Sequence, residues 1–200
     1  MSAIDTKNLP LIPGAVAGVV TWVLGYVFTY LLTATDLEES ALNQIVEFFE
    51  GESATYELVG WVFYNAHLVD ISYEGLGPFS PPRNFIGGED GFTVLLYVIP
   101  PLLLVAAGLA VARLNGATET NEGAIAGALV VPGYLVLTAV GVFLFEITVG
   151  GASGAPALAS ALIIAGVVYP VVFGALGGVI AAATADEPAP AVSDSNGPGS

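Results

Sequence analysis

The chain has 200 residues, of which 55% are hydrophobic and only 10% are charged, and its mean hydropathy is +0.81. Soluble domains carry about a quarter charged residues, so this composition excludes an ordinary soluble fold and predicts a membrane bundle. The 18 acidic residues against 3 basic ones give a net charge of −15, which argues against binding nucleic acid or anionic lipid headgroups. Cysteine is absent, which excludes disulfides, thiolate metal sites and cysteine nucleophiles.

The acidic residues lie almost wholly outside the apolar stretches, and therefore form a solvated surface. Scarce lysine with abundant aspartate and glutamate is typical of proteins from salt-loving archaea, where the medium screens the repulsion between like charges. We therefore expect a halophilic origin.

The first apolar stretch predicts a membrane span at about residues 11–33. About twenty apolar residues cross a hydrocarbon core of about 30 Å, and the stretch is too long for the apolar part of a secretory signal. Pro13 lies near its start, where a helix has no partner for the missing N–H. We expect an uncleaved span.

Residues 34–91 form the one long polar segment, which we expect outside the cell. Thr35 and Glu38 have the spacing of a capping box, which predicts a helix over about 36–50 with Thr35 as its N-cap and Gly51 at its end. This helix is amphipathic. Its apolar face is expected to fold back onto the bundle, with recruitment of a partner as the alternative.

A second helix is predicted over about 55–70, around an apolar stretch rich in aromatic residues from Leu58 to Val69. Twelve residues are too few to cross a bilayer, and Trp and Tyr prefer the membrane interface. We therefore expect this helix to lie on the outer surface of the membrane. A fifth span over 55–73 stays open as the alternative, because the Lys and Arg residues satisfy the positive-inside rule equally well in both topologies.

Three further spans are predicted at about 92–113, 123–147 and 157–184, followed by a disordered acidic tail over 185–200. The predicted fold is an all-α integral membrane protein, with a four-span helical bundle in residues 1–184 and an extracellular cap of short helices. Four spans place both termini on the same side, and with the N-terminus in the cytoplasm Lys7 and Arg113 are cytoplasmic and Arg83 is outside, which satisfies the positive-inside rule.

The spans carry a weak internal repeat. Residues 14–18 (GAVAG) match residues 123–127 (GAIAG), and Pro101 and Gly108 have the spacing of Pro170 and Gly177. This pattern predicts two similar hairpins, an arrangement that recurs in transporters. The alternative is chance similarity between sequences rich in Ala, Gly and Val.

Glycines spaced for close helix packing occur in three of the predicted spans. Small residues four apart let the backbones of membrane helices approach each other. The contacts are expected within one bundle, with an interface between copies of the chain as the alternative. The residues concerned are Gly14, Gly18, Gly123, Gly127, Gly174 and Gly178.

One cluster of polar residues resembles a site: Glu57, Asn65, His67 and Asp70. On a helix, His67 and Asp70 stand three residues apart on one face, where the carboxylate could orient the imidazole. No recognisable set of further ligands and no nucleophile accompanies them. We interpret the cluster as an interfacial polar group, and expect no catalytic, metal or cofactor site.

Proline lies inside three predicted spans, at Pro100, Pro101, Pro132 and Pro170. Kinked helices surround substrate sites in transporters, but proline is also common in helices that only pack. No span carries an ionisable residue at mid-depth, which disfavours a proton-coupled mechanism. The leading hypothesis is a non-catalytic structural or accessory subunit that packs in the lipid bilayer with another membrane protein or with its own copies. The alternative is a small oligomeric transporter or channel-like protein.

The segment from Gly60 to His67, GWVFYNAH, resembles a segment of small multi-pass membrane proteins from haloarchaeal genomes. The resemblance covers most of residues 10–184, and includes the glycine-containing first span and the later proline-containing spans. It implies membrane location and a salt-adapted origin. The family has no known function, although some members carry a generic transporter label, and it implies no catalytic residues.

Overall fold

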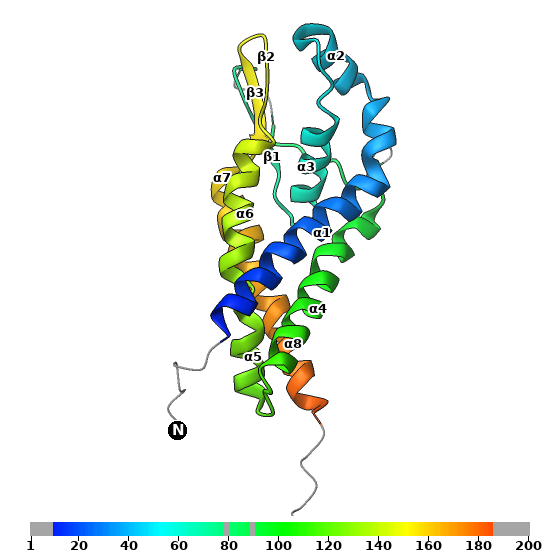
Figure 1. The fold of residues 1–200 in the computed structure, drawn as a ribbon. Helices are drawn as coiled ribbons and strands as arrows, with labels where there is room; N and C mark the ends of the chain where they lie inside the picture. Colours follow the sequence, from blue (N-terminus) through cyan, green and yellow to red (C-terminus); the bar gives the residue numbers. More distant parts are fainter. Residues whose placement is uncertain (1–9, 78–80, 89–90, 186–200) are drawn as a thin grey trace, which may run out of the picture.

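The computed structural model describes residues 10–77, 81–88 and 91–185 (Figure 1). Four helical stretches in it are long and apolar enough to cross a membrane: Leu11–Glu38, Val94–Leu114, Thr120–Leu144 and Leu158–Ala183. They confirm the prediction of four long apolar helices, as expected for a multi-pass membrane protein. The predicted acidic tail lies outside the described residues, except for Ala185.

The first long helix, α1 (Leu11–Glu38), is continuous, whereas each of the other three either changes helical type or is interrupted by a turn. The second joins a 3-10 turn, η2, to α4; the third consists of α5 and α6; and the fourth joins α7, a π-helical stretch η3, and α8. Their bounds are η2 Val94–Val98, α4 Ile99–Leu114, α5 Thr120–Ala128, α6 Val131–Leu144, α7 Leu158–Ser160, η3 Ala161–Val168 and α8 Tyr169–Ala183.

Proline coincides with each of these changes. Pro100, Pro132 and Pro170 each lie at the start of the segment that follows the change, in α4, α6 and α8 respectively. Proline has no N–H to continue the hydrogen-bond ladder of the preceding segment, so each position favours a break there.

The polar segment after α1 starts later than predicted. The first helix continues to Glu38, and the next helix, α2 (Ala41–Glu50), has Ser40 as its N-cap, with the Ser40 side chain accepting a hydrogen bond from the N–H of Asn43. The predicted start at 36 with Thr35 as cap is therefore wrong, because the backbone of Thr35 to Glu38 stays within α1. The predicted end is confirmed: Gly51 ends α2 with a left-handed backbone, at φ 81°.

A small antiparallel sheet departs from the all-α prediction. It contains β1 (Ile71–Glu74), β2 (Ile147–Val149) and β3 (Ala152–Pro156), in the order β1-β3-β2. Gly150 and Gly151 join β2 to β3, both with positive φ, which a two-residue hairpin turn favours. The third span therefore ends at Leu144, and not at the predicted residue 147, because Ile147 already belongs to the sheet.

The long helices touch backbone to backbone in the half of the molecule that holds α5, the start of α1 and the end of α8 (Figure 1). A methyl group added at Gly108 of α4 would lie 2.0 Å from the carbonyl oxygen of Gly174 in α8, and one added at Gly178 would lie 1.8 Å from that of Gly123 in α5. Only glycine fits these contacts.

All six glycines predicted from sequence face another helix of the same chain. Gly14 and Gly18 of α1 lie against the backbone of Leu129 and Val130, at the junction of α5 and α6. The other four lie between α5 and α8, and are Gly123, Gly127, Gly174 and Gly178.

Gly178→Val should lower the stability of the protein in detergent by about 1–3 kcal/mol or more, because the added carbon atoms must displace backbone of α5. Ala183→Val is the matched control, since Ala183 lies exposed in the same helix and its change should stay within about 0.5 kcal/mol. Thermal unfolding of both variants measures the difference. Equal unfolding temperatures would contradict the backbone contact.

Candidate functional site

The most deeply buried segment is the helix α3 (Thr55–Asn65). Every residue from Leu58 to Asn65 is buried, and Val59 and Val62 have no exposed surface. In Figure 1 this helix lies between α6 and α1, beside the upper part of the bundle. The prediction that residues 58–69 lie on the outer surface of the membrane is wrong, because such a helix would leave one face uncovered.

Glycines on α1 and α3 make room for the aromatic side chains around α3. A methyl group at Gly25 of α1 would lie 2.8 Å from the Phe63 ring, and one at Gly60 of α3 would lie 2.2 Å from the Phe145 ring. Phe63 also meets Trp22 of α1 edge to face, with 5.1 Å between ring centroids. The aromatic residues of α3 therefore fill the space between the long helices.

The chain reverses direction immediately after α3. The helix ends at Asn65, five residues before its predicted end, and Leu68 has a positive φ of 61°. The chain then returns to β1, whose partner strand β3 lies at the same end of the molecule as α2 (Figure 1). In this structure α3 is neither a surface helix nor a fifth span: it enters the bundle and comes back.

The Asn65 side chain holds this reversal together. Its amide nitrogen donates to the carbonyl of Val69 at 2.8 Å, and its amide oxygen accepts from the N–H of Phe85 at 2.8 Å. One buried amide thus connects the end of α3 to the returning strand and to the loop of residues 81–88. Because buried amides need partners, both bonds restrict how α3 can move.

His67 links α3 to α6. Its side chain is completely buried, with Nδ1 2.8 Å from the carbonyl oxygen of Phe63 and Nε2 2.6 Å from the hydroxyl of Tyr134. A carbonyl only accepts, so Nδ1 carries the proton, and Nε2 accepts from the Tyr134 hydroxyl. Burial lowers the pKa of His67 to about 4, so the ring is neutral at neutral pH. The imidazole ring also packs against Tyr169 of α8, with centroids 5.1 Å apart.

The four predicted site residues do not form one cluster. Because α3 ends at Asn65, His67 and Asp70 do not share a helix face, and the hydrogen bonds of His67 go to Phe63 and Tyr134 instead. Glu57 lies in the first turn of α3, at the other end of the helix. The backbone carbonyl of Asp70 accepts from the N–H of Ala157, at the end of β3.

Sequence reasoning missed Tyr134, the partner of His67. The only indication in the sequence is weak: a tyrosine in an apolar span suggests a buried hydrogen bond, since a buried hydroxyl needs a partner. Both ring nitrogens of His67 are engaged and the ring is sealed from solvent, so this pair can position α3 but offers no free base to a substrate. The described residues contain no group of three His, Cys, Asp or Glu side chains that could hold a metal ion.

Tyr134→Phe should destabilise the fold by about 1–3 kcal/mol, because it leaves Nε2 of the buried His67 without a donor. Tyr30→Phe is the matched control: Tyr30 lies 42% exposed in α1, and the same change there should stay within about 0.5 kcal/mol. Chemical or thermal unfolding in detergent measures both. A Tyr134→Phe variant as stable as the control would show that the hydrogen bond contributes nothing.

His67 is the one histidine of the chain, so selective ¹⁵N-histidine labelling reports on it alone. We expect a neutral ring protonated at Nδ1 down to about pH 4. The unfolded state binds a proton near pH 6.5 and the folded state does not, so stability should fall by about 3 kcal/mol as the pH falls from 6.5 to about 4. Titration of the ring near pH 6.5 would contradict its burial.

The comparisons with known proteins give one match. The model of a family described as "Family of unknown function (DUF7978)" matches residues 2–185. No curated protein and no solved structure matches the chain. Because the family model covers nearly all of the sequence, the chain belongs to the DUF7978 family of unknown function.

Proposed function

We propose that the protein is a non-catalytic accessory subunit of a membrane assembly, which binds its partner through α2. The exposed apolar side chains of this helix carry the proposal. Ile45, Phe48 and Phe49 are 52%, 82% and 64% exposed, at the end of the molecule away from α5 (Figure 1). Contiguous apolar surface of this kind marks interaction sites.

The opposite side of α2 is held firmly against the protein. Val46 is 5% exposed and Asn43 is 1% exposed. The Asn43 side chain accepts from the N–H of Ala54 at 2.8 Å and donates to the carbonyl of Glu38 at 3.0 Å, which ties α2 to both of its neighbours. The exposed face is therefore presented in a defined orientation, as a binding surface requires.

The filled interior supports a non-catalytic role. Trp61 donates to the carbonyl of Phe145 at 2.7 Å, and the Tyr64 hydroxyl donates to the carbonyl of Thr138. Asn65 and His67 have the partners described above. The buried polar side chains from Trp61 to His67 are thus used within the protein, and none of them is left to bind a substrate.

A small oligomeric transporter is the second candidate, favoured by the re-entry of α3. In transporters, substrate sites are surrounded by helices that enter the bundle and return, and by spans broken at proline. The first and third long helices also pack together, as do the second and fourth, which fits a repeat of two similar hairpins. In a transporter, α3 would have to move to open a path for the substrate through the bundle.

For the orientation, we propose that both termini are cytoplasmic and that residues 34–91 lie outside the cell. Arg113, at the end of α4, is then cytoplasmic, as the positive-inside rule expects. The acidic residues of α2 then face the outside medium. The haloarchaeal origin stays a prediction.

Purification from native membranes in mild detergent, followed by mass spectrometry, should recover a second membrane protein in stoichiometric amount. Phe48→Ser with Phe49→Ser should lose most of it, because the apolar contact surface is removed. Leu114→Ser is the control, since Leu114 is also 82% exposed but lies at the other end of the bundle. A pure homo-oligomer with no second protein would contradict the accessory role, and flux into liposomes would then test transport.

A further inference from the structure

We propose that a pocket at the junction of α1 and α2 receives an arginine side chain of the partner protein. The pocket has a volume of about 290 Å³ and is lined by Asp36, Leu37, Ser40, Leu42, Phe85, Gly91 and Phe92. The inference rests on the proposed function, and deepens it by stating the chemistry of the partner.

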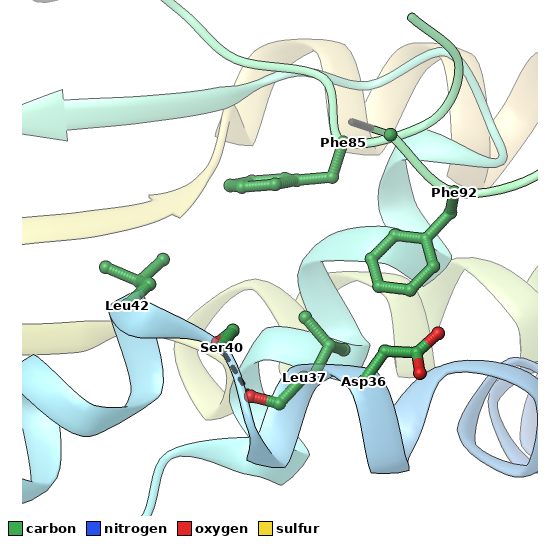
Figure 2. Close-up of a pocket in the computed structure, with 7 residues that line it drawn as sticks. Asp36, Leu37, Ser40, Leu42, Phe85 and Phe92 are labelled. Carbon is green, nitrogen blue, oxygen red and sulfur yellow. Dashed lines mark hydrogen bonds between the residues drawn. The ribbon is translucent and has the colours of Figure 1, made fainter. Parts of the chain in front are cut away.

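The pocket combines one carboxylate with apolar and aromatic walls. Figure 2 shows Asp36 beside Leu37 on one side of the pocket, together with Leu42, and the rings of Phe85 and Phe92 across from them. The Ser40 hydroxyl is already used, since it donates to the carbonyl of Leu37 at 2.7 Å and accepts from Asn43 as N-cap. The Asp36 side chain is exposed, and it makes no hydrogen bond or ion pair with any residue in the described part of the chain.

These groups fit a guanidinium better than other ligands. A carboxylate accepts two parallel N–H bonds from arginine, and aromatic faces attract its planar cation. An ammonium ion is more strongly hydrated and has no flat surface to stack, so lysine gains less. An anionic ligand would be repelled by the Asp36 carboxylate, and a neutral apolar ligand would gain nothing from its charge.

The pocket lies where a ligand can reach it from the aqueous phase. With 28 residues, α1 is about 42 Å long, whereas the hydrocarbon core is about 30 Å thick. Asp36 lies two residues before the end of this helix, at the end that carries α2 (Figure 1). The pocket therefore opens beyond the apolar part of the bundle.

The size and surroundings of the pocket favour a protein side chain over a free ligand. Its volume lies at the lower limit of pockets for small molecules, which begin at about 300 Å³. Leu42, which lines it, is followed on the same face of α2 by Ile45 and Phe49, both exposed. An apolar segment of the partner that packs along Leu42, Ile45 and Phe49 would place an adjoining arginine in the pocket, at the Leu42 end of this row.

The first test uses purified protein in nanodiscs and ligand-observed NMR with N-acetyl-arginine amide. The neutral isostere N-acetyl-citrulline amide and N-acetyl-lysine amide are the comparison compounds. We expect the arginine compound to bind most tightly. Asp36→Asn should weaken its binding about ten-fold and Phe92→Leu about three-fold, whereas Glu47→Gln, an exposed acid on α2, should leave it unchanged. Citrulline binding as tightly as arginine, or equal effects of Asp36→Asn and Glu47→Gln, would overturn the inference.

The second test measures how much partner copurifies with each variant. Asp36→Asn should retain less than Glu47→Gln does, and added N-acetyl-arginine amide should release the partner from the wild type. Full retention by Asp36→Asn would overturn the inference while leaving the proposed function intact. Recovery of no partner even with the wild type would overturn the proposed function itself.

The pocket could instead receive Arg83 of a second copy of the chain, because Arg83 is exposed. Sizing the purified protein as wild type, Asp36→Asn and Arg83→Gln distinguishes these two occupants. An oligomer that both changes dissociate would show that the pocket binds Arg83 of a second copy, and would overturn the assignment to a partner protein. An oligomeric state unaffected by either change agrees with the proposal.

Discussion

The structure depends on one constraint: the polar side chains from Trp61 to His67, in α3 and the turn after it, must find partners inside an apolar bundle. Neither lipid nor the apolar interior offers hydrogen bonds, and an unpaired buried group costs about 1–3 kcal/mol. Trp61, Tyr64, Asn65 and His67 meet this constraint with bonds that reach α6, the following Phe145 and the loop at Phe85. A short helix can therefore end deep among the long ones without exposing its backbone.

The same insertion divides the bundle into two differently packed parts. Around Gly108, Gly174 and Gly178 the long helices touch through their backbones, whereas around α3 they are separated by aromatic side chains. In one part the long helices contact each other directly, and in the other α3 lies between them. The binding surface that we propose lies at the end that carries α2, where an apolar row and the Asp36 pocket adjoin.

The structural features that could be predicted from the sequence were those with a long or repeated residue pattern. Continuous apolar stretches predicted four long helices, and glycines four residues apart lie at helix contacts. The burial of α3 could not be predicted, because twelve apolar residues fit an interfacial helix equally well. The bond from His67 to Tyr134 joins residues 67 positions apart, so no local pattern reveals it. The three strands were missed because β1 and β2 have only 4 and 3 residues, and β3 consists of Ala, Ser, Gly and Pro, which gives no alternation of polar and apolar side chains.

In this fold α3 enters the bundle and returns to the side from which it came. The chain has no cysteine, so single cysteines can be introduced at the exposed positions Glu52, Glu74 and Asn115 and probed with an impermeant maleimide in intact cells and in inverted vesicles. We expect the cysteines at Glu52 and Glu74 to be labelled from one side of the membrane and the cysteine at Asn115 from the other. Labelling at Glu52 and Glu74 from opposite sides would show instead that α3 crosses the membrane.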